Sequence, residues 1–222
     1  MTLPEIERQI GLYKHQGRKM FASSSFQTQS IVLLHIISKT DPAIPVMFVN
    51  TGYLFSETIE YRDRITSDFK LNVVDLNPLV SKNLQRDSAG NLFFTSDPDY
   101  CCYLNKVQPL DQILSEYDVW INGVRADQSN TRAELKTEDF APHNVIRFHP
   151  MLDWTKQMVW AYIKEHNLPR HPLDDKGFIS IGCEPCTRRI LPGDEERSGR
   201  WFGMQKNECG LNTDLVIKKN KK

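Results

Sequence analysis

Five cysteines carry the most distinctive chemistry in this 222-residue chain, and four of them form two close pairs. Cys101 and Cys102 are adjacent, while Cys183 and Cys186 form a C-x-x-C pair. Disulfides are rare in a reducing cytosol, so the pairs indicate metal ligation or thiol chemistry. If the fold brings the pairs together, four thiolates would bind Zn(II) or an iron–sulfur cluster. The adjacent pair favours the cluster, because structural zinc sites usually use two C-x-x-C knuckles; the alternative is that some are buried structural cysteines.

The fifth cysteine, Cys209, lies in a segment rich in glycines and cations. Arg197, Arg200 and Lys206 precede it in the sequence. Cationic neighbours stabilise a thiolate and lower the pKa of the thiol, which predicts a nucleophile at neutral pH. Glycines on both sides would let the segment carry this thiol into and out of a site. The alternative is an exposed thiol without a function.

Three polar loops follow predicted strands, which is where open parallel sheets bind their ligands. The first loop could cradle a phosphate with hydroxyl and backbone N–H groups, although it lacks the glycines and lysine of a Walker A motif. The second could pack an aromatic ring near a base or ribose, and the third offers guanidinium donors for phosphate or sulfate. Taken singly, each loop has a structural alternative: a helix cap, a packing loop or surface ion pairs. The candidate residues are Ser23, Ser24, Ser25 and Phe26 in the first loop, Thr51, Gly52 and Tyr53 in the second, and Arg125 and Arg132 in the third.

The elements that must position these residues alternate between strands and helices. Apolar runs predict strands at residues 20–25, 45–50, 71–76, 119–124 and 145–148. Helical spacing of apolar residues predicts helices at 4–20, 29–38, 56–70, 78–86, 100–117 and 154–166. This alternation predicts one α/β domain with a mostly parallel, twisted sheet flanked by helices. From residue 174 onward, glycines and prolines interrupt any periodicity, so no further sheet element is expected there.

Composition excludes several other classes of protein. The 28 Lys and Arg residues balance 28 Asp and Glu, which argues against a nucleic-acid or anionic-membrane partner. No apolar run approaches the roughly 20 residues that span a bilayer. We therefore expect a cytoplasmic protein, whose basic run at residues 218–222 is a solvated tail.

Eight ordered sequence blocks spread over nearly the whole chain resemble one known family. They are SSSF (23–26), TGYLFSET (51–58), CCYLNKVQPL (101–110), NGVRADQSNTRAE (122–134), PMLDW (150–154), IGCEPCTR (181–188), ERSGRW (196–201) and ECGL (208–211). The chain is thereby similar to the assimilatory phosphoadenylyl-sulfate and adenylyl-sulfate reductases, which share an adenine-nucleotide α-hydrolase-like fold. The resemblance implies that Cys101, Cys102, Cys183 and Cys186 bind a 4Fe-4S cluster that supports catalysis without carrying the electrons.

The resemblance also implies a two-step thiol reaction in sulfate assimilation. Cys209 would attack the sulfur of the sulfonucleotide, expel AMP and become S-sulfocysteine, which an external thioredoxin or glutaredoxin would reduce to release sulfite. By motif position, Arg197 and Arg200 resemble arginines that face the sulfate, and Lys106 resembles a lysine between cluster and substrate. The serine loop, the second loop and Arg125 fall where the family binds nucleotide. We therefore expect residues 1–190 to bind substrate and cluster, and 191–222 to form a flexible segment that carries Cys209.

Two features leave the substrate open. The cluster cysteines resemble the branch that reduces adenylyl sulfate, which we favour, whereas the serine-rich loops resemble the branch that takes the 3′-phosphorylated form; a dual-specific enzyme is the third alternative. The family commonly ends the last motif as ECGLH, but this chain has Asn212 there. An RNA sulfurtransferase of the same fold is disfavoured because the chain lacks the S-G-G-x-D-S loop. The oligomeric state stays open between a monomer and a homo-oligomer.

Overall fold

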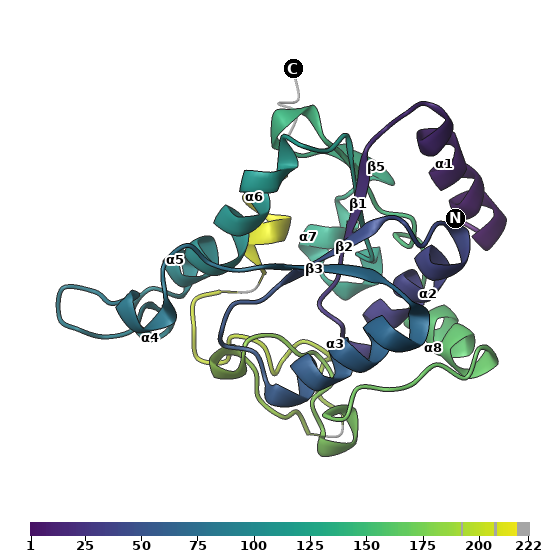
Figure 1. Cartoon of the computed structure of the whole chain (residues 1–222). Helices are drawn as coiled ribbons and strands as arrows, with labels where there is room; N and C mark the ends of the chain where they lie inside the picture. Colours follow the sequence, from purple (N-terminus) through teal and green to yellow (C-terminus); the bar gives the residue numbers. More distant parts are fainter. Residues whose placement is uncertain (192, 207, 217–222) are drawn as a thin grey trace.

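Six strands form one sheet in the computed structural model, which describes residues 1–191, 193–206 and 208–216 (Figure 1). The strand order is β3-β2-β1-β4-β6-β5. All neighbours are parallel except β5 and β6, which pair antiparallel at one edge. The strands are β1 (Met20–Ser23), β2 (Pro45–Val49), β3 (Asn72–Leu76), β4 (Val119–Asn122), β5 (Glu138–Phe140) and β6 (Ile146–Phe148).

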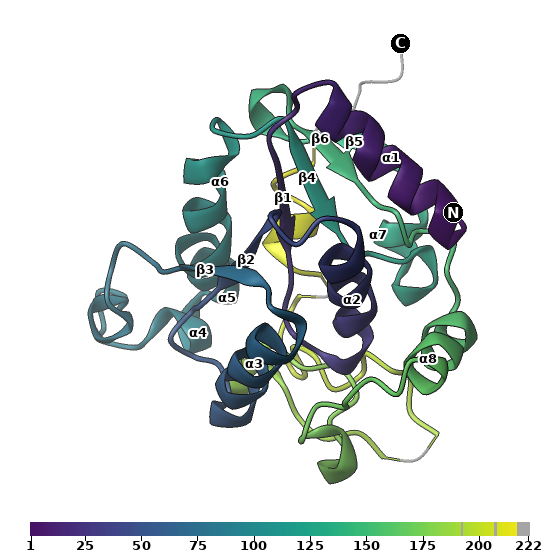
Figure 2. The ribbon, with the colours of Figure 1, turned by 45° about the vertical axis from the view of Figure 1, so that its right-hand side comes forward.

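The two faces of the sheet bury alternate residues of the same strands. Met20 and Ala22 of β1 belong to one apolar cluster, while Phe21 between them belongs to a second. Because side chains alternate along a strand, an apolar run such as this one supplies both faces at once. Helices cover each face, as Figure 2 shows.

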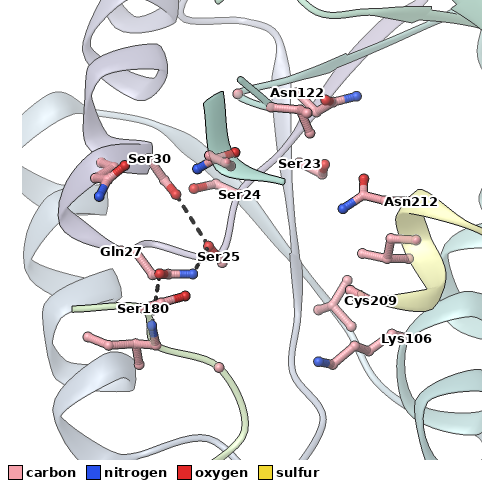
Figure 3. Close-up of a pocket in the computed structure, with 18 of the residues that line it drawn as sticks. Ser23, Ser24, Ser25, Gln27, Ser30, Lys106, Asn122, Ser180, Cys209 and Asn212 are labelled. Carbon is pink, nitrogen blue, oxygen red and sulfur yellow. Dashed lines mark hydrogen bonds between the residues drawn. The ribbon is translucent and has the colours of Figure 1, made fainter. Parts of the chain in front are cut away.

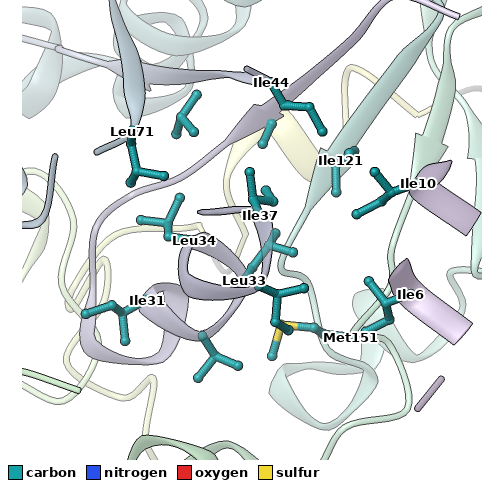
Figure 4. Close-up of a cluster of buried hydrophobic side chains, with 14 of the residues drawn as sticks. Ile6, Ile10, Ile31, Leu33, Leu34, Ile37, Ile44, Leu71, Ile121 and Met151 are labelled. Carbon is teal, nitrogen blue, oxygen red and sulfur yellow. The ribbon is translucent and has the colours of Figure 1, made fainter. Parts of the chain in front are cut away.

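Four of the longer helices cover the first face. They are α1 (Leu3–His15), α2 (Ile31–Thr40), α3 (Ser56–Phe69) and α8 (Lys156–Glu165). Leu33, Leu34 and Ile37 of α2 belong to the apolar cluster on this face, together with Ile6 and Ile10 of α1 (Figure 4). The second face is covered by α6 (Gln108–Leu114), through Leu110 and Leu114.

The chain direction across the sheet changes between β1 and β4. From β1 the chain moves outward to β2 and β3, then crosses back to β4 on the other side of β1. In such sheets the loops at the carboxyl ends of the two central strands diverge and leave a crevice. This arrangement places the serine loop after β1 beside the arginine-bearing loop after β4.

The cysteine pair lies on a helix with an irregular middle. It runs as α5 (Pro98–Cys102), a π-helical segment (Tyr103–Val107) and α6. Asp97 caps its start by accepting a 2.9 Å hydrogen bond from the Tyr100 N–H. Pro109 lacks the N–H that an α-helix would donate to the residue 105 carbonyl, and the wider turn lies just before it. Single π-helical turns occur frequently at functional sites.

The predicted elements are confirmed with one exception. The helix predicted at residues 78–86 is wrong, because only a 3-10 turn (Lys82–Leu84) forms there. The buried Gln85 and Asn105 side chains exchange two amide hydrogen bonds of 2.6 and 2.9 Å, which hold this stretch against the cysteine-bearing helix as a loop. The sequence analysis missed β5 and the short helices α4 (Phe93–Ser96) and α7 (Asn130–Ala133).

The segment after residue 174 contains no strand or α-helix within its described part, as predicted. It nevertheless packs against the domain: Trp201 and Leu215 are each 2% exposed. Flexibility of this segment stays a prediction, and the basic run at 218–222 lies outside the described residues. Within the described part of the chain, no helix has the length and apolar character to cross a membrane.

We expect Leu34→Ala to destabilise the protein by about 3 kcal/mol, because it leaves a cavity under α2 where Leu34 is 0% exposed. Leu12→Ala is the matched control, since Leu12 on α1 is 46% exposed and should cost at most about 0.5 kcal/mol. Urea unfolding of both variants measures the difference. Equal midpoints for the two variants would contradict this account of the core.

Candidate active site

One pocket lies at the carboxyl ends of the central strands (Figure 3). Ser23 and Asn122, which end β1 and β4, are aligned neighbours in the sheet and both line it. The segment that bears Cys209 forms the opposite wall, so Cys209 faces the serine loop across the pocket, as Figure 3 shows. Residues from six distant parts of the sequence therefore share this pocket: the loops after β1, β2 and β4, the cysteine-bearing helix, strand β6 and the C-terminal segment.

The serine loop is held by its own hydrogen bonds. The Ser24 Oγ accepts from the Phe26 N–H at 3.1 Å, and the Ser25 and Ser30 hydroxyls lie 3.2 Å apart. Ser23 accepts a 2.7 Å bond from the Trp120 indole. All three predicted serines line the pocket, whereas Phe26 turns away into the core, where its ring packs edge-on against Phe48 at 5.4 Å. Directly after this loop, α2 begins, and the free N–H groups of a helix start favour an anion.

The second loop divides between two pockets. Thr51 lines the main pocket, and its Oγ lies 3.3 Å from the Cys183 Sγ. Tyr53 instead lines a smaller pocket that contains the paired cysteines. Gly52 adopts a φ of 72° and its carbonyl accepts a bond from Lys82 at 2.9 Å, outside both pockets. Of the three residues predicted in this loop, Thr51 alone lines the candidate substrate space.

The two arginines of the third loop have different positions. Arg132 lines the pocket and forms a two-pronged pair with the Glu208 carboxylate, at 2.9 and 3.0 Å. Arg125 does not line it: its side chain is 2% exposed and bonds Asp127 and Gln29. Arg125 thus braces Gln29, which is a pocket-lining residue.

Two further arginines approach from the C-terminal segment. Arg197 and Arg200 line the pocket, and their guanidinium carbons lie 5.4 and 4.4 Å from the centre of the Trp201 ring. Burial lowers the pKa of Arg197 to about 10, and the neighbouring Arg132 lowers it in the same direction. A site that gathers cations despite this cost is suited to an anionic ligand.

Several buried polar atoms that line the pocket have no hydrogen-bond partner among the described residues. They include both amide atoms of Asn122 and the Nε atoms of Arg147 and Arg200. Buried polar groups are almost always paired in folded proteins, so unpaired donors here indicate space for a ligand that accepts hydrogen bonds. Sequence reasoning missed Asn122 and Arg147. The available signal was the presence of a polar residue and an arginine within predicted buried strands, because buried polar side chains require partners.

Cys209 lies where cations surround it. A hydrogen bond from the Cys102 thiol is the largest influence that holds the pKa of Cys209 well below its usual range. The Lys106 ammonium acts in the same direction, and burial acts against it. Conversely, the pKa of Lys106 is raised, because the charges of Cys183, Cys209 and Cys102 outweigh the effect of burial. The site can therefore hold a thiolate nucleophile at neutral pH.

The four paired cysteines line one small pocket beside the larger one. Cys101, Cys102 and Cys183 are buried, and burial raises the pKa of Cys101 to about 11. Lys106 and Cys183 line both pockets. Four of the residues that line the small pocket are cysteines, and four thiolates fit an iron–sulfur cluster or zinc by ligand chemistry. No three His, Cys, Asp or Glu side chains of the described chain are arranged as a metal-ligand group, so the thiols share the pocket without converging.

Comparison with known proteins gives a consistent result. Residues 19–189 match the profile of the phosphoadenosine phosphosulfate reductase domain. A phosphoadenosine 5′-phosphosulfate reductase of Gloeobacter violaceus is 40% identical over 199 residues, covering 88% of this chain and 83% of the relative. An adenosine 5′-phosphosulfate reductase of Halalkalibacterium halodurans is 38% identical over 201 residues, covering 90% and 87%.

Solved structures share the fold. A phosphoadenylyl-sulfate reductase from Candida auris superposes with a TM-score of 0.66 at 22% identity, over 80% of this chain and 87% of that one. A U34-tRNA thiolase from Methanococcus maripaludis, which carries a [4Fe-4S] cluster, gives 0.51 at 16% identity over 70% and 59%. These likenesses confirm the predicted nucleotide α-hydrolase-like sheet.

We expect Lys106→Gln to move the alkylation of Cys209 to higher pH. The Lys106 cation lowers the pKa of Cys209, so its removal raises that pKa and shifts the iodoacetamide rate profile upward. Lys39→Gln, an exposed lysine at the far end of α2, is the control and should leave the profile in place. Mass spectrometry of the Cys209 peptide measures the rate at each pH. A downward shift or none would show that the cation does not act on this thiol.

Proposed function

Since the chain belongs to the phosphoadenosine phosphosulfate reductase family, we propose that it reduces adenylyl sulfate to sulfite and AMP. It is an oxidoreductase that acts on a sulfur group, as the names of its relatives state for them. The observation that carries the proposal is the shared pocket: a cysteine thiol, four arginines and unpaired buried donors face a serine loop at the switch point of the sheet. This combination provides a nucleophile together with the cations that a sulfonucleotide requires.

The first step is attack by the Cys209 thiolate on the sulfur of the substrate. An S–S bond forms, the bond from sulfur to the phosphate oxygen breaks, and AMP leaves with that electron pair. Arg197 and Arg200 offset the negative charge of the sulfate as it approaches the thiolate. Both side chains line the pocket that Cys209 faces, which supports this assignment.

The second step needs a dithiol donor, for which we propose thioredoxin or glutaredoxin. A donor thiolate attacks the Cys209 sulfur, and sulfite leaves with the electron pair of the S–S bond. The second donor thiol then resolves the mixed disulfide, so sulfur gains two electrons and the donor becomes a disulfide. The five cysteines of this chain are all unpaired, which suits a reducing compartment such as the cytoplasm.

We propose that Cys101, Cys102, Cys183 and Cys186 hold a 4Fe-4S cluster. All four thiols line one small pocket, which supports this ligand set. When bound, the cluster would place additional charge beside Lys106 and stabilise the site without passing electrons to the substrate. Lys106 itself lines both pockets, so its ammonium is placed to act on the cysteines and on the substrate space.

Adenylyl sulfate is the substrate we favour, because the sulfur ligand set resembles the branch of the family that takes it. The second candidate is the 3′-phosphorylated nucleotide, or both nucleotides. The hydroxyls of Ser23, Ser24 and Ser25 line the pocket and could receive a 3′-phosphate, and one relative at 40% identity is named for that substrate. The two nucleotides differ only in this phosphate, so a direct comparison decides between them.

We expect the anaerobically purified protein, supplied with thioredoxin, to release sulfite from adenylyl sulfate with a higher kcat/KM than from its 3′-phosphorylated analogue. Comparable or reversed values would establish the second candidate and direct attention to Ser23, Ser24 and Ser25. Cys209→Ser is the matched control: it should still bind nucleotide but form no S-sulfo adduct. Sulfite release by this variant would contradict the assignment of the nucleophile, and no sulfite from either nucleotide with the unaltered enzyme would refute the function.

We expect Cys183→Ser to lose iron and most of the activity, because one of four thiolate ligands is replaced by a hydroxyl. Iron content and absorption near 400 nm measure the loss. The control is Cys209→Ser, which should retain iron, since this cysteine lies outside the small pocket. Retention of iron by both variants would rule out the proposed ligand set.

A further inference from the structure

A carboxylate directly precedes the nucleophile in the chain and is almost completely buried. Glu208 is 4% exposed. Burial alone would raise the pKa of this carboxyl, but the paired arginines lower it to about 2, so it is ionised. A buried charge of this kind requires charged or hydrogen-bonding partners. Glu208 belongs to the ECGL block, but the resemblance gives it no role, and it is not among the residues that line the pocket.

The partners of Glu208 come from three separate parts of the chain. Arg132, on α7, donates to both carboxylate oxygens at 2.9 and 3.0 Å, and Arg197 donates at 3.2 Å. The Ser129 hydroxyl, at the start of α7, donates at 3.1 Å. The third part is the Cys209 peptide itself, whose N–H donates to Glu208 Oε1 at 2.9 Å. One carboxylate thus links both arginines to the backbone of the nucleophile.

Asn212 extends this link into the sheet. Its amide nitrogen donates to Glu208 at 3.3 Å, and its side-chain oxygen accepts from Arg147 at 3.1 Å. Arg147 on β6 is 0% exposed and also bonds the carbonyls of Leu211 and Leu215, at 3.0 and 3.2 Å. The short turn after Cys209 (Gly210–Asn212) is therefore fixed at both ends.

We propose that Glu208 is a positioning residue that aligns the Cys209 thiol with the pocket arginines and, as an internal anion, moderates their attraction for the substrate. The inference rests on the proposed function, because it concerns the attack of Cys209 on the bound sulfonucleotide. The Cys209 N–H bond fixes the peptide that carries the thiol. The Glu208 carboxylate offsets the positive charges of Arg132 and Arg197. Without it, only a bound ligand would offset these two charges.

A positioning role and a purely structural role of Glu208 predict different effects of mutation on substrate binding and on the reaction rate. Glu208→Gln keeps the size of the side chain but removes the charge, so Arg132 and Arg197 lose their internal counter-ion. The substrate should then bind with an equal or lower Kd. The thiol should react more slowly, because the Gln amide nitrogen cannot accept the bonds that Ser129 and Arg132 donate to Oε2, so the side chain that holds the Cys209 peptide shifts. If Glu208 had a purely structural role, Glu208→Gln would both weaken substrate binding and slow the reaction.

The test separates binding from chemistry. In a single turnover without reductant, mass spectrometry follows formation of the S-sulfo adduct on Cys209 from adenylyl sulfate. We expect Glu208→Gln to slow this step by about tenfold or more. The Kd for adenylyl sulfate is measured in the Cys209→Ser background, with and without Glu208→Gln, and should not rise. Glu208→Asp, which keeps the charge but shortens the side chain, should slow the adduct while leaving the Kd unchanged.

Glu195→Gln is the matched control, because it removes the same charge from an exposed carboxyl of the same segment. It should form the adduct at the rate of the unaltered enzyme. An unchanged adduct rate in Glu208→Gln, or a raised Kd together with loss of iron, would overturn the inference. If the unaltered enzyme itself forms no adduct, the proposed function has failed instead, so the two failures are distinguishable.

Discussion

The structure of this protein depends on the compensation of buried charges at one end of the sheet. Arg147 and Glu208 are 0% and 4% exposed, and a lone buried ion costs far more than a fold of this size can tolerate. Each is paired across the chain: Arg147 with the turn after Cys209, and Glu208 with Arg132 and Arg197. Those pairs attach the C-terminal segment, which has no strand or α-helix in its described part, to the sheet. Charge compensation therefore acts together with the apolar contacts of Trp201 and Leu215 to dock this segment.

The same constraint explains why the two pockets lie side by side. Lys106 lines both of them and carries a cation that the cysteines on either side stabilise. Its position follows from the helix that also bears the cysteine pair, with one helical turn between Cys102 and Lys106. A ligand that changes the charge of the small pocket would therefore act on the substrate space through this side chain.

The buried amide pair between Gln85 and Asn105 shows why one element was predicted wrongly. Residues 78–86 have helical spacing of apolar residues, yet they form a loop held by a partner 20 positions away. Local spacing carries no information about such a partner, which the fold supplies. Arg125 is a second case, in the candidate active site, in which the local sequence did not predict the tertiary partner. A guanidinium after a buried strand suggested a direct ligand, but the structure places it behind Gln29.

The sequence by itself determined the α/β class, most element positions and the residue types of the site, because apolar periodicity and cysteine spacing are local properties. It also carried the family resemblance, which the comparisons confirm. Only the tertiary structure decided which candidates meet. It brought Ser23, Arg132 and Cys209 to one pocket and turned Phe26 into the core. It also revealed Glu208 and Asn212 as the link between nucleophile and arginines, because their partners Ser129, Arg132 and Arg147 lie 65 to 79 positions away, and no local pattern encodes such distances.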